Sequence, residues 1–228
     1  MARNYPLYGL TEEPQLRAIF REAKVWWLSN ELEDLVSESR RWLICEVFQR
    51  SSNEAALLAL ALFGGIEFPE LRLADIEVMQ SWFEGAQVPA RNVRDALVLK
   101  VWLPWFTERP NAVVEEKLRE WLHSAPGLVR AALVTCVGLA QEVQSNEVKS
   151  LVMASLGSLA SQRDREVGSA IGWFLATMWH REPELVERWL NANAARLSRR
   201  VYRIAVGRMP TSVRVRLLEK WKASRPHF

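Results

Sequence analysis

REWLHSAPGLVRAALV (residues 119–134) contains the end of one predicted helix, a short loop and the start of the next helix. The first helix ends shortly after Trp121. Pro126 falls between the two apolar segments, and a residue without a backbone N–H is typical of a helix boundary. The second helix opens on small residues, including Ala132. A unit of two short amphipathic helices buries its apolar faces only by packing against further units.

The same unit recurs along the chain. Trp42, Trp82 and Trp121 stand 40 and 39 residues apart, and Trp189 follows 68 residues later, close to two periods, with the skipped position near Leu156. A second series consists of alanines early in apolar segments, at spacings of 40, 36, 38 and 35 residues: Ala56, Ala96, Ala132, Ala170 and Ala205. Strand signals are nearly absent. A period of 35–40 residues built from two helices predicts an all-α superhelix, or solenoid, of HEAT-like repeats with one concave face, forming a single domain over residues 1–228.

The composition excludes several classes of protein. The 228 residues are 49% apolar, enough for a sizeable core, and no apolar run is long enough to span a membrane. MARNYPLYGL (1–10) lacks the apolar segment of a secretion signal, which favours the cytoplasm. Cys45 and Cys136 lie in apolar helical segments and are expected to be buried free thiols. The three histidines are scattered, with no spacing that suits a metal ion, so we expect no metal site. We also expect a monomer.

VGSAIGWFLATMWH (167–180) is an apolar helical segment with two glycines, Gly168 and Gly172, four residues apart. Each glycine inside a helix costs about 1 kcal/mol relative to alanine. Because residues four apart share one face of a helix, the pair offers a smooth surface for a neighbouring helix or for the backbone of a ligand. Trp173 breaks the rhythm of the other tryptophans, which favours a place on the concave face over one in the core. Trp102 and Trp105 are expected to be core residues.

The C-terminal segment is strongly basic. Residues 196–225 contain ten arginines and lysines and one acidic residue, Glu219. The basic residues are Arg196, Arg199, Arg200, Arg203, Arg208, Arg214, Arg216, Lys220, Lys222 and Arg225. Such a segment suits a polyanion, of which the phosphate backbone of a nucleic acid is the commonest. The alternative is a solvated helical surface whose cations gather near the C-terminus.

Segments distributed over nearly the whole chain resemble, in order and spacing, the AlkD-like DNA alkylation repair glycosylases. These segments are PLYGLTEEPQLRAIFREA (6–23), EVFQRSSNEAALLAL (46–60), RDALVLKVWLPWFTERP (94–110), EWLHSAPGLVRAALV (120–134), and AIGWFL, EPELVERWL and RLSRR within 170–200. The resemblance implies a superhelix that cups double-stranded DNA on a basic concave face. It also implies excision of purines alkylated at N3 or N7, without extrusion of the base and without a metal or cofactor.

The resemblance also assigns site residues. The family's catalytic aspartate falls on Asp95, and its second cleft tryptophan falls on Trp173. Arginines expected at the DNA backbone are Arg130, Arg199 and Arg200, with Arg203 in the same basic segment. A purine alkylated at N3 or N7 is cationic, so its glycosidic bond is already weak. A carboxylate can stabilise the positive charge that develops on the sugar, and an aromatic face can share it through cation–π attraction.

One position departs from the family pattern, because the first cleft tryptophan falls on Arg91. Arg91 and Asp95 are spaced i, i+4 on one predicted helix, where they can form an ion pair that partly neutralises the carboxylate. A cation at this position also repels a cationic base, although an arginine can stack or hold a phosphate. Three functions therefore stay open: a DNA glycosylase, a DNA-binding protein with altered specificity or without base excision, and a HEAT-like protein–protein scaffold.

Overall fold

The computed structural model describes residues 73–81, 83, 91–142, 146–161 and 164–224, and this part of the chain contains helices and loops with no strand. The all-α prediction is confirmed. The chain divides into two compact units, Met1–Trp105 and Phe106–Phe228. The HEAT-like classification and the single continuous domain over residues 1–228 stay predictions. Several positions named above lie outside the described residues: Trp42, Cys45, Ala56, Trp82 and the segments 6–23 and 46–60.

The first unit contains α4 (Leu73–Ser81), α5 (Arg91–Leu97) and the π-helix η4 (Val98–Trp102), which continues directly into α6 (Leu103–Thr107). Trp102 and Trp105 are buried, as predicted. The rings of Phe83 and Trp102 lie 4.7 Å apart at a tilt of 35°, so the described core of this unit is partly aromatic.

The π-helical turn has a local cause in Pro104. The N–H of Leu103 donates to the carbonyl oxygen of Val98, five residues earlier, in place of the usual four. Proline has no N–H, and in a regular helix its ring collides with the carbonyl four residues before it, which here belongs to Lys100. A wider turn immediately before Pro104 accommodates the ring without ending the helix.

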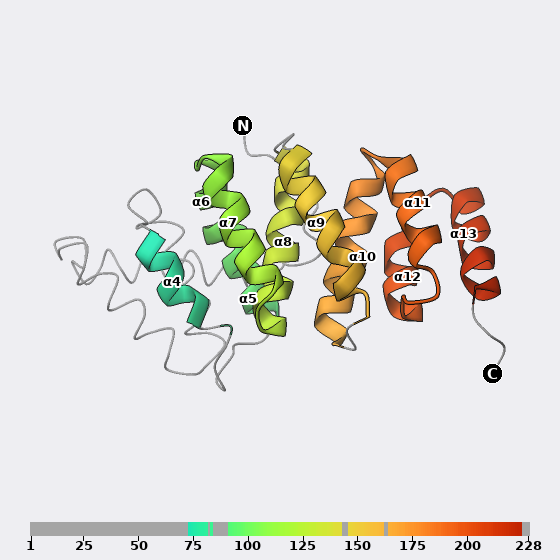
Figure 1. Cartoon of the computed structure of the whole chain (residues 1–228), viewed down its shortest axis with the longest axis horizontal. Coiled ribbons are helices and arrows are strands. Elements are labelled where there is room, and N and C mark those ends of the chain that lie inside the picture. The colour runs from blue at the N-terminus through green and yellow to red at the C-terminus, as the bar shows by residue number, and fades with distance from the viewer. Residues whose placement is uncertain (1–72, 82, 84–90, 143–145, 162–163, 225–228) are drawn as a thin grey trace, which may run out of the picture. The chain divides into compact units, whose positions relative to one another are not determined.

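The second unit is a row of helices that follow one another in chain order from α7 to α13 (Figure 1). Its helices are α7 (Asn111–Leu122), α8 (Pro126–Glu142), α9 (Asn146–Leu159), α10 (Arg165–Trp179), α11 (Pro183–Asn193), α12 (Arg199–Val206) and α13 (Thr211–Ala223). Prolines predicted to separate the helices do so: Pro126 and Pro183 are first helical residues, and Pro110 and Pro210 are N-caps.

These helices pack in two alternating layers. In one layer α8 contacts α10 and α10 contacts α12, and in the other α7 contacts α9 and α11 contacts α13. The periodic alanines Ala132, Ala170 and Ala205 are all fully buried, and they belong to α8, α10 and α12. Small side chains in the same place on successive helices let those helices approach closely. The observed layers agree with the two-helix unit that the sequence period predicts.

The glycines of α10 face α12. A Cβ added to Gly168 would lie 3.0 Å from Cγ2 of Val201. A Cβ added to Gly172 would lie 2.7 Å from Cβ of Ile204 and 2.9 Å from the carbonyl oxygen of Val201. Because these distances are shorter than ordinary van der Waals contact, no other residue fits at Gly172 without moving α12. Of the two expected occupants of the glycine face, a neighbouring helix is the one observed.

We expect Gly172→Ala to lower the free energy of unfolding by about 1–3 kcal/mol, because the added methyl group overpacks the contact with α12. The matched control is Gly157→Ala in α9, where an added Cβ meets nothing within 4 Å. That variant should gain about 0.5–1 kcal/mol from the better helix propensity of alanine. Urea unfolding of both variants measures the difference, and equal shifts in the same direction would contradict the packing argument.

Candidate nucleic-acid interface

Helix α12 has one buried apolar side and one exposed basic side. Val201, Tyr202, Ala205 and Val206 are buried, whereas Arg199, Arg200 and Arg203 are exposed. Residues three and four apart share one side of a helix, so the three arginines lie together. The hydroxyl of Ser198 caps the helix by accepting from the N–H of Val201 at 3.2 Å. The result is a short helix with a basic side and no acidic residue.

Arg200 is held against α10. Its Nε donates a hydrogen bond to Oγ of Ser169 at 3.1 Å, and this hydroxyl donates to the carbonyl oxygen of Arg165 at 2.8 Å. Ser169 is 5% exposed. Arg199 and Arg203 form no ion pair with a described residue. The three arginines therefore differ, since one is fixed at its Nε and two project freely from α12.

Arg130, on α8, lies in the interior. Only 2% of its surface is exposed, and its Nη1 donates to the carbonyl oxygen of Glu166 in the first turn of α10 at 2.8 Å. A buried guanidinium needs hydrogen-bond acceptors, and this contact joins α8 to α10. The structure thus gives Arg130 a packing role, and its expected contact with a phosphate stays a prediction.

Trp173 differs from its neighbours in α10. From Val167 to Met178 every residue of the helix is buried except Trp173, which is half-buried. The helix begins at a well-formed cap, in which the Asp164 carboxylate accepts from the N–H groups of Glu166 and Val167 at 2.8 and 2.9 Å. Between Val167 and Met178, the Trp173 side chain is therefore the one that reaches the surface.

Asp95 and Arg91 lie in α5, in the first unit, and α5 places them four residues apart on one helix as predicted. Asp95 is 4% exposed. The side chain of Arg91 is outside the described part of the structure. Trp173, Arg130 and the α12 arginines all belong to the second unit. The predicted ion pair of Arg91 with Asp95, and the predicted facing of Asp95 and Trp173, stay predictions.

A sequence model of the DNA alkylation repair enzymes matches residues 1–209. The chain belongs to the DNA alkylation repair enzyme family. The match includes α5, α10 and α12, so every candidate residue named above falls within the family region. Membership in this family gives the chain a role in DNA repair. Comparison with curated proteins gives no match.

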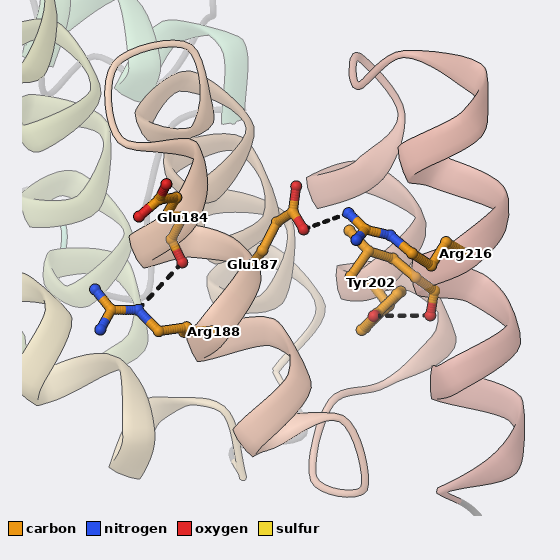
Figure 2. Close-up of polar contacts among 6 residues, drawn as sticks. Glu184, Glu187, Arg188, Tyr202 and Arg216 are labelled. Carbon is orange, nitrogen blue, oxygen red and sulfur yellow. Dashed lines mark hydrogen bonds and ion pairs between the residues drawn. The ribbon is translucent and has the colours of Figure 1, made fainter.

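In this family member, helix α13 lies beyond the matched residues and is fastened to α12 by two aromatic side chains. The Tyr202 hydroxyl donates to the carbonyl oxygen of Leu217 at 2.9 Å, as Figure 2 shows. Nε1 of Trp221 donates to the carbonyl oxygen of Leu197 at 3.2 Å, and the rings of Tyr202 and Trp221 lie 5.7 Å apart. With α13 docked by these contacts, the three arginines of α12 are exposed.

Helix α13 also contacts α11 through charge. Arg216 forms an ion pair with Glu187 of α11, at 2.5 Å between nitrogen and oxygen (Figure 2). The side chain of Arg216 is 55% exposed, and a pair so open to water contributes little stability. The pair does engage Arg216, one of the basic C-terminal residues, with a carboxylate of the protein itself.

Groups for metal or membrane binding are not found in the described residues. Among them, no three or more His, Cys, Asp and Glu side chains are placed to hold a metal ion. No described helix combines the length and the apolar character that a membrane span requires. Cys136 is a buried free thiol whose pKa is raised by burial, as its apolar segment suggested.

Sequence reasoning missed Ser169. The residue stands between two glycines in GSAIG (168–172), and its meaning depends on Arg200, 31 residues later. The available signal was a hydroxyl on the face of α10 that the glycines hold close to a second helix. Tyr202 and Trp221 were missed as well, because their docking contacts join carbonyl groups far along the chain.

We expect the stability of the protein to fall between pH 10 and 12 in a way that depends on Tyr202. Burial, and secondarily the Glu187 carboxylate, raises the pKa of Tyr202 to about 12. An unfolded tyrosine loses its proton near pH 10, so the folded state binds more protons in this range and unfolding becomes easier as pH rises. Tyr202→Phe should have a lower Tm at pH 7 and a shallower fall of Tm from pH 10 to 11.5. Parallel alkaline slopes for wild type and variant would contradict the assignment.

Proposed function

We propose that this chain is a DNA glycosylase that removes purines alkylated at N3 or N7 from double-stranded DNA. Family membership supports a role in DNA repair, and the half-buried Trp173 is the observation that carries the more specific proposal. A half-buried tryptophan among buried neighbours, on a helix that packs against a helix whose exposed side is basic, offers an aromatic face next to bound phosphates. We propose that the protein acts as a monomer in the cytoplasm.

The α12 arginines bind the phosphate backbone of DNA. Arg199, Arg200 and Arg203 are exposed on one side of the helix, and arginine binds phosphate through paired N–H groups. Contacts of this kind are independent of base sequence, which suits a protein that must find a damaged base in any sequence context. A scaffold for other proteins has no need for this concentration of cations.

Trp173 and Asp95 supply the chemistry. A purine alkylated at N3 or N7 carries a positive charge, and the face of an indole attracts cations. When the bond between C1′ and N9 breaks, the base leaves with the electron pair and becomes neutral, while positive charge passes to the sugar. A carboxylate beside the sugar stabilises that charge and orients the water whose oxygen adds to C1′, with the proton of the water passing to solvent.

Arg91 favours a second candidate function, a DNA-binding protein that recognises damage without excising the base or that accepts a different lesion. The position belongs to an aromatic residue in the family pattern, and a cation there opposes the binding of a cationic base. Base release separates the two functions, because both require salt-dependent affinity for DNA and only the glycosylase breaks the glycosidic bond.

We expect Asp95→Asn to slow the single-turnover release of N7-methylguanine from duplex DNA by on the order of 100-fold, because the amide lacks the charge that stabilises the sugar cation. Trp173→Leu should slow release by roughly 2- to 30-fold, the range of a desolvated cation–π contact. The control is Trp179→Leu, which removes a second half-buried tryptophan of α10 and should release base at the wild-type rate. Release by wild type and Asp95→Asn at the same spontaneous rate would rule out a glycosylase.

We expect Arg91→Trp to increase excision of N7-methylguanine by roughly 2- to 30-fold, because it replaces a repelling cation by an attracting aromatic face. Arg91→Gln serves as the control, since it removes the charge without adding a ring and so separates the two effects. The measurement is again the single-turnover rate of base release. Loss of activity in Arg91→Trp would contradict this account and would give Arg91 a direct part in the reaction.

A further inference from the structure

One face of α10 carries both Ser169 and Trp173. The two residues are four apart in a regular helix, so their side chains lie one turn from each other on the same side. Ser169 is nearly buried, Trp173 is half-buried, and the guanidinium of Arg200 reaches this face from α12. The arginine is therefore fixed one helical turn from the tryptophan.

The Ser169 hydroxyl both donates and accepts a hydrogen bond. It donates to the carbonyl oxygen of Arg165 at 2.8 Å, which fixes the direction of its proton, and its lone pair accepts from Nε of Arg200 at 3.1 Å. Among the described residues, this is the one hydrogen bond that the Arg200 guanidinium makes. With Nε engaged, the end of the guanidinium still offers one parallel N–H pair, one N–H from each Nη atom, which can bind two oxygens of one phosphate.

We propose that Ser169 is a positioning residue that orients Arg200 to bind a backbone phosphate of DNA beside Trp173. The proposal rests on the DNA binding of the proposed function and adds a residue that does not touch the DNA itself. Arg199 and Arg203 have no such anchor among the described residues and bind as untethered charges. An oriented guanidinium loses less rotational freedom on binding than a free one, so the hydrogen bond to Ser169 raises affinity.

The test is a double-mutant cycle on affinity for an undamaged duplex. We expect Ser169→Ala to weaken binding about fivefold, the usual effect of removing one oriented hydrogen bond. The same substitution in the background of Arg200→Ala should cause no further loss, whereas in the background of Arg203→Ala it should again cost about fivefold. Coupling to one arginine and not to the other is a result that a general loss of stability does not produce.

Ser155→Ala is the matched control for removal of a hydroxyl. Ser155 is 9% exposed in α9 and donates to the carbonyl oxygen of Leu151 at 3.0 Å, the same i to i−4 bond that Ser169 makes. Ser155→Ala should bind DNA with wild-type affinity. The Tm of both serine variants is measured in parallel to compare their stability.

Three outcomes overturn the proposal: wild-type affinity of Ser169→Ala, losses for Ser169→Ala and Arg200→Ala that simply add, or equal coupling to Arg203. A wild-type chain that shows coupling on undamaged DNA but releases no methylated base would support this inference while overturning the glycosylase. A wild-type chain without salt-dependent affinity for DNA would overturn both.

Discussion

The close contact of α10 with α12 at Gly168 and Gly172 is the constraint on which the described site depends. The positions where Cβ atoms would stand are taken by the Val201 and Ile204 side chains and by the Val201 carbonyl group. Each glycine weakens the isolated helix by about 1 kcal/mol, and close packing of two buried helical faces offsets the loss. The same approach of the two helices brings Nε of Arg200 within reach of Ser169.

The arginines show how packing decides what a charge does. Arg130 and Arg200 both donate to oxygen atoms of α10, one to a carbonyl group in the first turn and one to a serine hydroxyl. Arg130 is buried and its hydrogen bond joins α8 to α10. Arg200 is exposed, so the rest of its guanidinium is open to water. A buried guanidinium must be satisfied by protein atoms, and an exposed one is available to a phosphate.

Much of the fold followed from local rules that the sequence states directly. Proline positions predicted helix boundaries, the alanine period predicted a repeated unit of two helices, and the spacing of Gly168 and Gly172 predicted a smooth contact face. The π-helical turn before Pro104 was not predicted, because the same proline also fits the end of a helix. Less of the site could be predicted from the sequence. The burial of Arg130 and the hydrogen bond of Arg200 to Ser169 depend on which side of each helix faces its neighbour. Residue identity alone does not fix that rotation, and the resemblance named positions without their surroundings.

We propose that Trp173, Asp95 and the α12 arginines act on the same stretch of DNA. The most direct test is a crystal structure of the chain bound to a duplex that carries a stable analogue of an N7-alkylated purine. The account predicts the Trp173 ring within about 6 Å of the modified base, the cation–π range. It also predicts the Asp95 carboxylate beside the sugar of that nucleotide and Arg200 on a neighbouring phosphate. DNA bound elsewhere on the chain, or an Asp95 that stays enclosed and far from the lesion, would contradict it.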